Sequence, residues 1–513
     1  MIARLPWMLI GFPEVSLEGF LEKGFRARWI GSLGTNEGMD LSVWLSQTRL
    51  YAMDALSADV VVLGGGSAGY AAARTLAGQG AQVLVIDGAP ELGGLCILRG
   101  CMPTKALLHA AELRHSIREG EPWGISAGDV RVDSQRLFAR KDALIADFAG
   151  YRRQQLEDGR FRLIRAQARF EQPGLIRLAD GRAVSFGHAV VATGSSVAPV
   201  SVPGLEAVGY LTSDSALAEA RIPESLVVLG GGAVALEFAQ FYSRMGSRVT
   251  VIQRGPQLLS GYDADVAGEL EKGFRREGIE VFTGTRLERV ERTGELKQVW
   301  FRQGDAVRSV EGAEIFHGLG RVANTSGLGL ETLGVSLERG RIATDLQQRT
   351  SRNEVFAAGD CCGPHEVVHL AVQQGEVAAH NILNPGRPRT MDYRLMLSVV
   401  FTSPQVAQVG LSEREAQGKG VAYRSESYPF NDHGKSMILG AQEGFVKVLA
   451  DPVSGEVLGA ACVGPQAGEL IHEPAVAMAA RMTAAQWAAV PHYHPTLAEI
   501  WTYPAESLAE SLV

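Results

Sequence analysis

The feature that most constrains the fold is a glycine-rich segment that follows an apolar run and opens an alanine-rich stretch. The run 59–63 leads into Gly64, Gly66 and Gly69, and a second apolar run ends in Asp87, eighteen residues after Gly69. Strand, G-x-G-x-x-G turn, helix, second strand and closing acid together are the dinucleotide-binding fingerprint of a parallel α/β sheet. The sequence therefore predicts such a sheet at the start of the main domain.

Each position of the fingerprint has its own physical reason. Gly64 makes the tight turn, Gly66 lets backbone N–H groups approach a pyrophosphate, and Gly69 lets the helix pack closely on the strand. Asp87 can accept hydrogen bonds from ribose hydroxyls. The same letters also spell G-x-S-x-G, the nucleophile elbow of α/β-hydrolases with Ser67 as the nucleophile, but a hydrolase has no use for the closing acid.

The unit recurs 166 residues later, with a strand at 226–229, a helix that carries Glu237 and a strand at 249–252. In the second copy the four fingerprint positions are held by Gly230, Gly232, Ala235 and Gln253. A constant offset predicts a duplicated fold that binds two different dinucleotides.

The second copy lacks the closing acid, because Gln253 takes its place and Arg254 follows directly. A carboxylate there would repel a 2′-phosphate, whereas an amide beside a guanidinium tolerates or attracts it. The pair favours NADP(H); the alternative is that Arg254 is a solvated surface charge.

Composition narrows the class of protein. The 513 residues are enough for three or four domains, and 46% hydrophobic and 21% charged residues indicate a globular chain. A net charge of −8, without a run of five Lys or Arg, does not indicate nucleic-acid binding. The longest apolar runs are strand-sized, which argues against a membrane span. Five scattered cysteines favour a reducing, cytoplasmic compartment, in which a disulfide is catalytic rather than structural.

The stretch 31–54 shows no clear period, and we expect residues 1–56 to be a poorly ordered or loosely docked extension without a chemical role. The apolar run 5–12 behind Arg4 leaves a signal peptide as the alternative, although no small-residue cleavage site follows.

Two of the five cysteines, Cys96 and Cys101, lie just after the first unit with four residues between them. This spacing does not suit a zinc knuckle, whose ligands are closer together and need a second pair. On one regular helix the two thiols would lie off a common face, but a first turn that starts loosely at Gly100 lets them approach disulfide distance. The alternative is that both are small buried apolar residues at the start of a helix over 105–113.

An ordered set of motifs extends from about Ser57 to the C-terminus. They are the first fingerprint, Gly93-Gly94-x-Cys96-x4-Cys101-x-Pro103-Thr104-Lys105, Ala192-Thr193-Gly194, the second fingerprint, Gly320-Arg321-x-x-Asn324, Ala357-Ala358-Gly359-Asp360, and His494-Pro495-Thr496-Leu497-Ala498-Glu499. The chain resembles the FAD-dependent pyridine nucleotide–disulfide oxidoreductases, the group that includes dihydrolipoamide dehydrogenase, glutathione reductase and mercuric reductase.

The resemblance implies an α/β fold with two Rossmann-like domains, for FAD and NAD(P), and a C-terminal α+β dimerisation domain. The implied domains are an extension (1–56), the FAD domain in two parts (57–200 and 324–390), the NAD(P) domain (201–323) and the interface domain (391–513). A homodimer follows, with no metal, membrane or nucleic-acid partner.

The resemblance also implies residue roles. Cys96 matches the thiol that exchanges with the substrate, Cys101 the thiol stacked on the flavin, and Lys105 and Glu237 the pair beside its reactive edge. His494 resembles the acid–base supplied by the other subunit, and Glu499 the carboxylate that orients it. His494 as a structural loop residue, or His492 in its place, are the alternatives. The implied FAD-binding residues are Gly64, Gly66, Gly69, Asp87, Gly94, Thr193, Gly194 and Asp360; those for NAD(P) are Gly230, Gly232, Ala235, Gln253, Arg254 and Gly320.

Some positions depart from the family pattern. Leu98 and Arg99 stand in the cysteine loop where asparagine and a small apolar residue are common, Ala233 replaces a gating tyrosine, and Ala323 replaces a proline. Dihydrolipoamide, free or on a lipoyl domain, is the first expectation for the substrate. A glutathione-type reductase using NADPH, a mercuric reductase homologue without the C-terminal cysteine pair, and a flavin-based redox sensor are the alternatives.

Two further patterns are typical of other kinds of site. The run 365–369 spells H-E-x-x-H, the zinc-peptidase signature, with His365 and His369 as ligands; a zincin needs this run inside a helix, and Gly363-Pro364 directly precedes it. The adjacent Cys361 and Cys362 are expected to be packing residues, with a second redox or metal site as the alternative. Cys462 is expected in the core of a strand.

Overall fold

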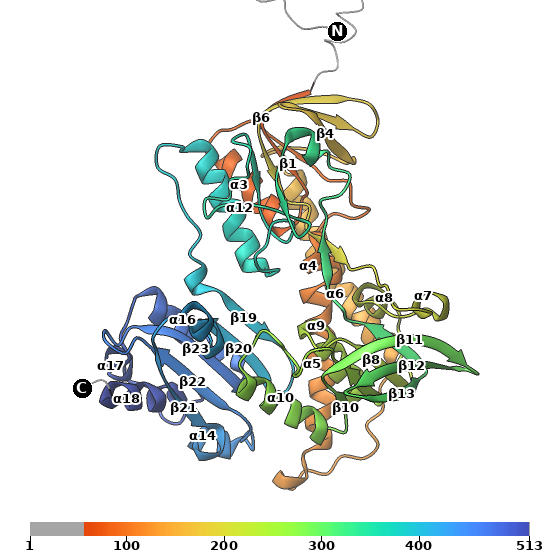
Figure 1. Ribbon diagram of the computed structural model, residues 1–513, viewed down its shortest axis with the longest axis vertical. Coiled ribbons are helices and arrows are strands. Elements are labelled where there is room, and N and C mark those ends of the chain that lie inside the picture. Colours follow the sequence, from red (N-terminus) through yellow and green to blue (C-terminus); the bar gives the residue numbers. More distant parts are fainter. Residues whose placement is uncertain (1–55, 512–513) are drawn as a thin grey trace, which may run out of the picture. The chain divides into compact units, whose positions relative to one another are not determined.

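The computed structural model describes residues 56–511 (Figure 1). Within this range a mixed, largely parallel α/β sheet and a parallel α/β sheet precede an antiparallel sheet with helices, so the predicted fold class is confirmed. The predicted extension over 1–56 and its signal-peptide alternative lie outside the described residues, apart from Leu56. None of the described helices combines the length and the apolar character needed to cross a bilayer.

The first sheet has the strand order β3-β2-β1-β6-β5-β4, and β18 pairs with the end of β6. Its strands are β1 (Leu56–Leu63), β2 (Val83–Ile86), β3 (Arg162–Ile164), β4 (Ala168–Gln172), β5 (Leu175–Leu178), β6 (Ala183–Val191) and β18 (Val355–Ala357). Strand β1 begins three residues before the predicted strand, because its first part pairs with β6 from Leu56 onwards.

Helices α3 (Ser67–Gly78) and α12 (Val368–Leu383) lie side by side on the first sheet (Figure 1). Val60 and Val62 point into the core that these helices cover, while Val61 and Leu63 point into the core on the opposite face. Because both faces are covered, the strand reads as a continuous apolar run rather than as an alternating one.

The second sheet repeats the first at the offset seen in the sequence. It is parallel, with the order β10-β9-β8-β14. Val60 pairs with Val83 in the first sheet, and Leu226 pairs with Val249 in the second, so the register is preserved over 166 residues. Its elements are β8 (Ser225–Leu229), α9 (Ala233–Met245), β9 (Arg248–Ile252), α10 (Ala264–Arg276), β10 (Glu280–Phe282) and β14 (Glu314–His317). An antiparallel sheet follows β10: β11 (Thr285–Thr293), β12 (Leu296–Gln303) and β13 (Ala306–Gly312).

Shorter elements connect these sheets. They are β7 (Ser195–Val197), α7 (Leu205–Val208), α8 (Ser213–Ala218), β15 (Arg321–Ala323), α11 (Leu330–Leu333), β16 (Leu337–Glu338) and β17 (Arg341–Ile342). Strand β15 pairs with β7, so the chain returns from the second unit along the strand by which it left the first.

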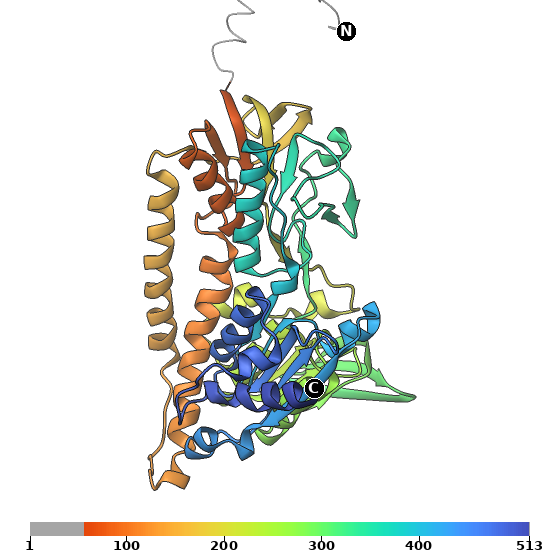
Figure 2. The same cartoon turned by 90° about the vertical axis from the view of Figure 1, so that its left-hand side faces the viewer.

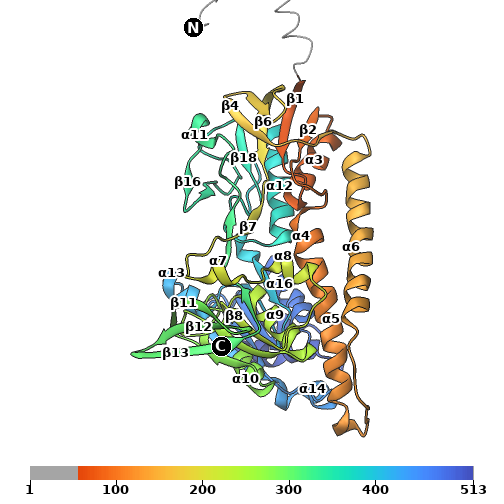
Figure 3. The same cartoon turned by 90° about the vertical axis from the view of Figure 1, so that its right-hand side faces the viewer.

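Two long helices stand beside the sheets, α5 (Cys101–Arg118) and α6 (Ser134–Glu157), and they pack against each other (Figures 2 and 3). The predicted helix over 105–113 is therefore too short at both ends. A separate helix, α4 (Gly94–Arg99), precedes α5. Gly100 interrupts the helical conformation between them, with φ −132° and ψ −117°.

The C-terminal region contains a five-stranded antiparallel sheet, β19-β20-β23-β22-β21. Its elements are β19 (Leu397–Val400), β20 (Gln405–Gly410), α13 (Glu413–Lys419), β21 (Arg424–Pro429), α14 (Gly434–Ile438), β22 (Phe445–Ala450), β23 (Val457–Gly464), α15 (Ala467–Leu470), α16 (His472–Ala479), α17 (Ala484–Ala488) and α18 (Thr502–Ser511). Trp487 and Trp501 are fully buried against this sheet, with ring centroids 5.7 Å apart.

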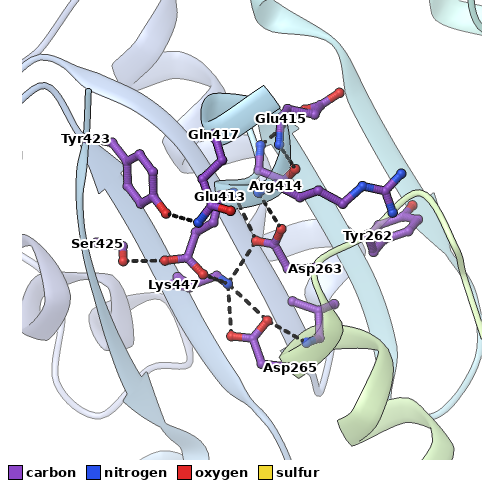
Figure 4. A network of polar contacts seen from close by, with 12 residues as sticks. Tyr262, Asp263, Asp265, Glu413, Arg414, Glu415, Gln417, Tyr423, Ser425 and Lys447 are labelled. Atoms are coloured by element: carbon purple, nitrogen blue, oxygen red, sulfur yellow. Dashed lines mark hydrogen bonds and ion pairs between the residues drawn. The ribbon is translucent and has the colours of Figure 1, made fainter. Parts of the chain in front are cut away.

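A buried ionic cluster ties the C-terminal sheet to the second α/β unit (Figure 4). The ammonium of Lys447, on β22, donates at 2.9 Å to Asp263 and Asp265, at the start of α10, and at 2.9 Å to Glu413, at the start of α13. Asp263 also accepts the backbone N–H of Arg414 at 3.0 Å. These three carboxylates form the one group with metal-like spacing in the described chain, and the lysine ammonium occupies its centre.

Candidate active site

Glycines at the carboxyl end of β1 leave a backbone cradle. A Cβ added at Gly64 would lie 2.4 Å from the carbonyl oxygen of Ala192, and one added at Gly69 would lie 1.8 Å from that of Gly64. Gly94 faces Gly66 across the cradle, where its Cβ would lie 2.7 Å from the Gly66 Cα. Side chains at these positions would fill the space at the start of α3, where helix N–H groups favour a phosphate.

Two carboxylates lie at this end of the sheet. Asp87 accepts a hydrogen bond from the N–H of Gly65 at 2.7 Å, so it stabilises the conformation of the glycine loop. Asp360 accepts the hydroxyl of Ser195 at 2.6 Å, and Arg321 donates to the same hydroxyl at 2.8 Å. The predicted FAD residues therefore converge from segments far apart in the chain, and the cradle fits a dinucleotide.

Thr193 and Gly194 are held in the same region by Asn324. The Asn324 N–H donates to the Gly194 carbonyl at 2.9 Å, and its side-chain amide donates to that of Thr193 at 3.0 Å. Since Asn324 directly follows β15, these bonds fix the crossing between the two nucleotide units.

The thiols of Cys96 and Cys101 share a hydrogen bond, because the break at Gly100 turns α5 away from α4. This contact raises the pKa of Cys96, and burial adds to the shift. The same hydrogen bond lowers the pKa of Cys101 to about 7; burial opposes this effect and the Lys105 ammonium reinforces it. When one proton is shared, the negative charge therefore resides on Cys101.

Lys105 and Glu237 meet beside this pair, although they are 132 residues apart. The ammonium of Lys105 donates to the Glu237 carboxylate at 2.7 Å and lies 4.6 Å from the centroid of the Phe401 ring. Glu237 is only 3% exposed and also accepts the Phe401 N–H at 3.0 Å. Helix α5 of the cysteine motif, helix α9 of the second nucleotide unit and the segment after β19 thus contribute one residue each.

His494 lies on the C-terminal region, and its ring nitrogen Nδ1 is 3.0 Å from the Glu499 carboxylate. Its side chain is 77% exposed, and among residues 56–511 no hydrogen bond joins it to Cys96 or Cys101. His492 behaves differently, because Glu473 and the Val490 carbonyl engage both of its ring nitrogens, at 2.6 and 2.8 Å. Of these two described histidines, His494 is the one that presents a free ring nitrogen to the outside.

His433, which no sequence motif indicated, is fully buried, and its Nε2 lies 3.3 Å from the same Glu499 carboxylate. Its Nδ1 bonds the Ser436 hydroxyl at 2.7 Å, and burial lowers its pKa, so it remains neutral. The short helix between β21 and β22 brings it to the site, a placement that no local motif encodes.

The second cradle differs from the first in one exchange of small residues. Gly230 turns as Gly64 does, with a Cβ position 2.3 Å from the Gly318 carbonyl. Ala235 occupies the third glycine position, and a Cβ at Gly318 would lie 2.6 Å from its methyl group. Gly318 takes the place of Ala192, so the close helix–strand contact is kept with the glycine moved to the strand. Gly232 faces open space, and Gly320 turns with φ +115°.

The closing position of this unit carries no acid. The Gln253 side chain donates to the Gln257 carbonyl at 3.2 Å, and Arg254 is exposed without a hydrogen-bond or ion-pair partner in the described chain. The guanidinium is free to meet a nucleotide.

The competing motifs find no support. His365 and Glu366 lie before α12, not inside a helix, and neither His365 nor His369 belongs to a metal-like group of the described residues. Ser67 begins α3 and bonds no histidine within 56–511. Cys361 is fully buried, its thiol donating to the Val191 carbonyl at 3.3 Å, and Cys462 lies in the core on β23.

Residues 58–375 match the family described as pyridine nucleotide-disulphide oxidoreductase, and residues 396–505 match its dimerisation domain. The chain belongs to this family. A dihydrolipoyl dehydrogenase of Thermus scotoductus is 37% identical over 461 residues, or 89% of this chain and 98% of that protein. A mercuric reductase of Streptomyces lividans is 33% identical over 462 residues, or 88% and 97%. The crystal structure of LpdA from Mycobacterium tuberculosis superposes with a TM-score of 0.79 at 30% identity, over 88% of this chain and 99% of that one.

Membership confirms the resemblance seen in the motifs. The protein is an FAD-dependent disulfide oxidoreductase that uses FAD and NAD(P)H. Its dimerisation domain supports a homodimer.

Proposed function

We propose that Cys96 and Cys101 form the redox-active disulfide and that the substrate is a dithiol of the dihydrolipoamide type, free or on a lipoyl domain. The observation that carries this proposal is the thiol pair held between the glycine cradle and the Lys105–Glu237 ion pair. Several relatives are dihydrolipoyl dehydrogenases, at 31–37% identity, which supports this substrate over mercury or glutathione.

The FAD pyrophosphate would be held by Gly64, Gly66, Gly69 and Gly94. Asp87, which bonds the glycine loop, and Asp360 would contact other parts of the FAD. When bound, FAD relays an electron pair between the cysteines and NAD(P). Gly230, Gly232, Ala235 and Gly320 would shape the second nucleotide site. We assign Lys105 and Glu237 to the boundary between the two sites, because their ion pair joins the helix of the cysteine motif to the helix of the second nucleotide unit.

A substrate thiolate attacks Cys96, which forms a mixed disulfide and releases Cys101 as a thiolate. The lowered pKa of Cys101, about 7, makes it a good leaving group. The second thiol of the substrate then attacks the substrate sulfur atom that is bonded to Cys96, which closes the substrate disulfide and releases Cys96. The dithiol is thereby oxidised to a disulfide, and the overall reaction gives NAD(P)H and one proton from NAD(P)⁺.

The partner's His494 would accept the proton of the attacking substrate thiol. Its pairing with Glu499 fixes one ring nitrogen and leaves the other exposed, as a base that acts on a second subunit requires. We expect Glu499→Gln to lower turnover about 10²-fold, the lower end of what general-base catalysis contributes.

Gln253 and the unpartnered Arg254 support use of NADPH. We infer that NADPH serves at least as well as NADH, and that Arg254→Gln shifts the preference towards NADH. The thiol pair implies a reducing compartment, for which we propose the cytoplasm.

A steady-state panel tests the proposal: NADH and NADPH, each with lipoamide, oxidised glutathione and Hg(II). We expect lipoamide to be reduced fastest. Cys101→Ser should keep bound FAD but lose disulfide reduction, whereas Cys462→Ser, the matched control in the core, should retain it. Turnover of lipoamide by the Cys101→Ser enzyme would refute the relay.

A further inference from the structure

Among residues 56–511, no carboxylate pairs with the guanidinium of Arg152, which lies on a helix next to α4. It lies on α6, which packs against α4, the helix that carries Cys96. Its Cζ is 4.2 Å from the ring centroid of Tyr70, four residues after Gly66 on α3. The nitrogens Nε and Nη1 are buried without an acceptor in the described chain. Burial lowers the pKa of Arg152, while Tyr70 and Cys96 act in the opposite direction.

The neighbouring guanidiniums differ in this respect. Arg160 donates to Asp158 at 2.7 Å, Arg74 pairs with Glu376, and Arg99 lies 3.9 Å from Asp214. Each of these three arginines therefore has a carboxylate neighbour, which Arg152 lacks among the described residues.

Gln155 lies one turn after Arg152 on α6, and its side-chain oxygen is also buried without a donor. Burying polar groups without partners is unfavourable, and most of all for a charged one. Two such residues on consecutive turns indicate that a polar ligand supplies the missing hydrogen-bond partners on this face of α6.

We propose that Arg152 binds an anionic group of the disulfide or dithiol substrate beside Cys96. This inference rests on the proposed function, because it requires that Cys96 is the thiol that meets the substrate. The Tyr70 ring covers one face of the guanidinium and leaves its edge for a bidentate contact with a carboxylate. Among the dithiolane substrates proposed above, Arg152 therefore favours the free acid, which carries a carboxylate, over the amide.

The flavin pyrophosphate is the other anion expected near α3. The cradle between Gly66 and Gly94 already offers backbone N–H groups to it. Leu156, one turn after Arg152 on α6, lies against Gly65 of the glycine loop, but the charge of Arg152 also interacts with Cys96, and we therefore assign Arg152 to the substrate.

Lipoate and lipoamide provide matched probes, since they share the dithiolane ring and differ by a carboxylate in place of an amide. The ratio of kcat/KM for lipoate to that for lipoamide is measured with the FAD-loaded enzyme. We expect Arg152→Gln to lower this ratio about tenfold, which corresponds to about 1.4 kcal/mol. Arg153→Gln is the control, because it removes the same charge from an exposed position on the same helix and should leave the ratio unchanged.

An unchanged ratio in Arg152→Gln would overturn the proposal. So would weaker FAD binding with an unchanged ratio, because Arg152 would then serve the pyrophosphate. Should Arg152→Gln fail to fold, Arg152→Lys, which keeps the charge but loses the fork, must give a ratio below that of the wild type. A wild-type enzyme that reduces neither lipoate nor lipoamide contradicts the proposed function itself. If the wild-type enzyme is active but Arg152→Gln leaves the lipoate-to-lipoamide ratio unchanged, only the role of Arg152 is contradicted.

Discussion

Replacing Lys447 by methionine should destabilise the protein by about 3 kcal/mol. The ammonium lies 2.9 Å from each of Asp263, Asp265 and Glu413, and its side chain is only 4% exposed. Removing one partner of a buried ion pair costs about 3–5 kcal/mol, because the charges left behind stay uncompensated. Asp265 is 47% exposed, so water screens its share and the lower end of that range applies.

The assay is urea unfolding of the FAD-loaded enzyme at pH 7.5, with Lys272→Met as the control. Lys272 pairs with Glu269 on the surface and is 72% exposed, so its loss should cost at most about 0.5 kcal/mol. Equal unfolding free energies for the two variants would refute the reasoning, since the buried cluster would then contribute no more than a surface pair.

The pH dependence of the same difference has a defined sign. The carboxylates raise the pKa of Lys447 above its usual 10.5, although burial opposes them, so its contribution is present below that pH and is lost as the pH rises through the higher folded value. The pKa of Asp263 is lowered below 3.8: burial acts against this, but the hydrogen bond from Lys447 outweighs it. The Asp263 contribution is therefore present above pH 3.8 and is lost as the pH falls through the lower folded value. The gap between wild type and Lys447→Met should shrink at both extremes.

Two further outcomes concern the site. Gly64→Ala should abolish FAD retention through gel filtration, because its Cβ would lie 2.4 Å from a carbonyl oxygen, while Gly78→Ala, with nothing within 4 Å, should retain the flavin. In the reduced enzyme, alkylation of Cys101 by iodoacetamide should rise through about pH 7, and Lys105→Met should move that midpoint upward because it removes a charge that lowers the pKa. A midpoint unmoved by Lys105→Met would contradict the electrostatic role given to that ammonium.

The two nucleotide units were predictable because their determinants are local. Gly64 and Gly230 each follow an apolar strand directly, and the offset between the copies reappears as an identical strand register. The approach of the two cysteines was also predictable, since Gly100 directly before Cys101 permits the break between helices that brings the thiols together.

Other parts of the site depend on contacts between distant segments, which leave no local pattern. Phe401 reaches Lys105 only after the C-terminal sheet has docked, and His433 reaches Glu499 from a separate turn. The buried nitrogens of Arg152 have no acceptor among the described residues, and this property cannot be recognised from the charged residues that are near Arg152 in the sequence. The H-E-x-x-H letters show the converse: the motif exists in sequence, but a preceding turn keeps its first histidine out of the helix.

The central claim is that electrons pass between NAD(P)H and the disulfide formed by Cys96 and Cys101. The most direct measurement adds one equivalent of NADPH or NADH, without oxygen, to the oxidised FAD-loaded enzyme and then maps alkylated cysteines by mass spectrometry. The account predicts that two new thiols appear per chain, at Cys96 and Cys101, while the labelling of Cys361, Cys362 and Cys462 stays unchanged. Labelling at 96 and 101 that is the same before and after reduction, or new thiols at 361 and 362 instead, would contradict it.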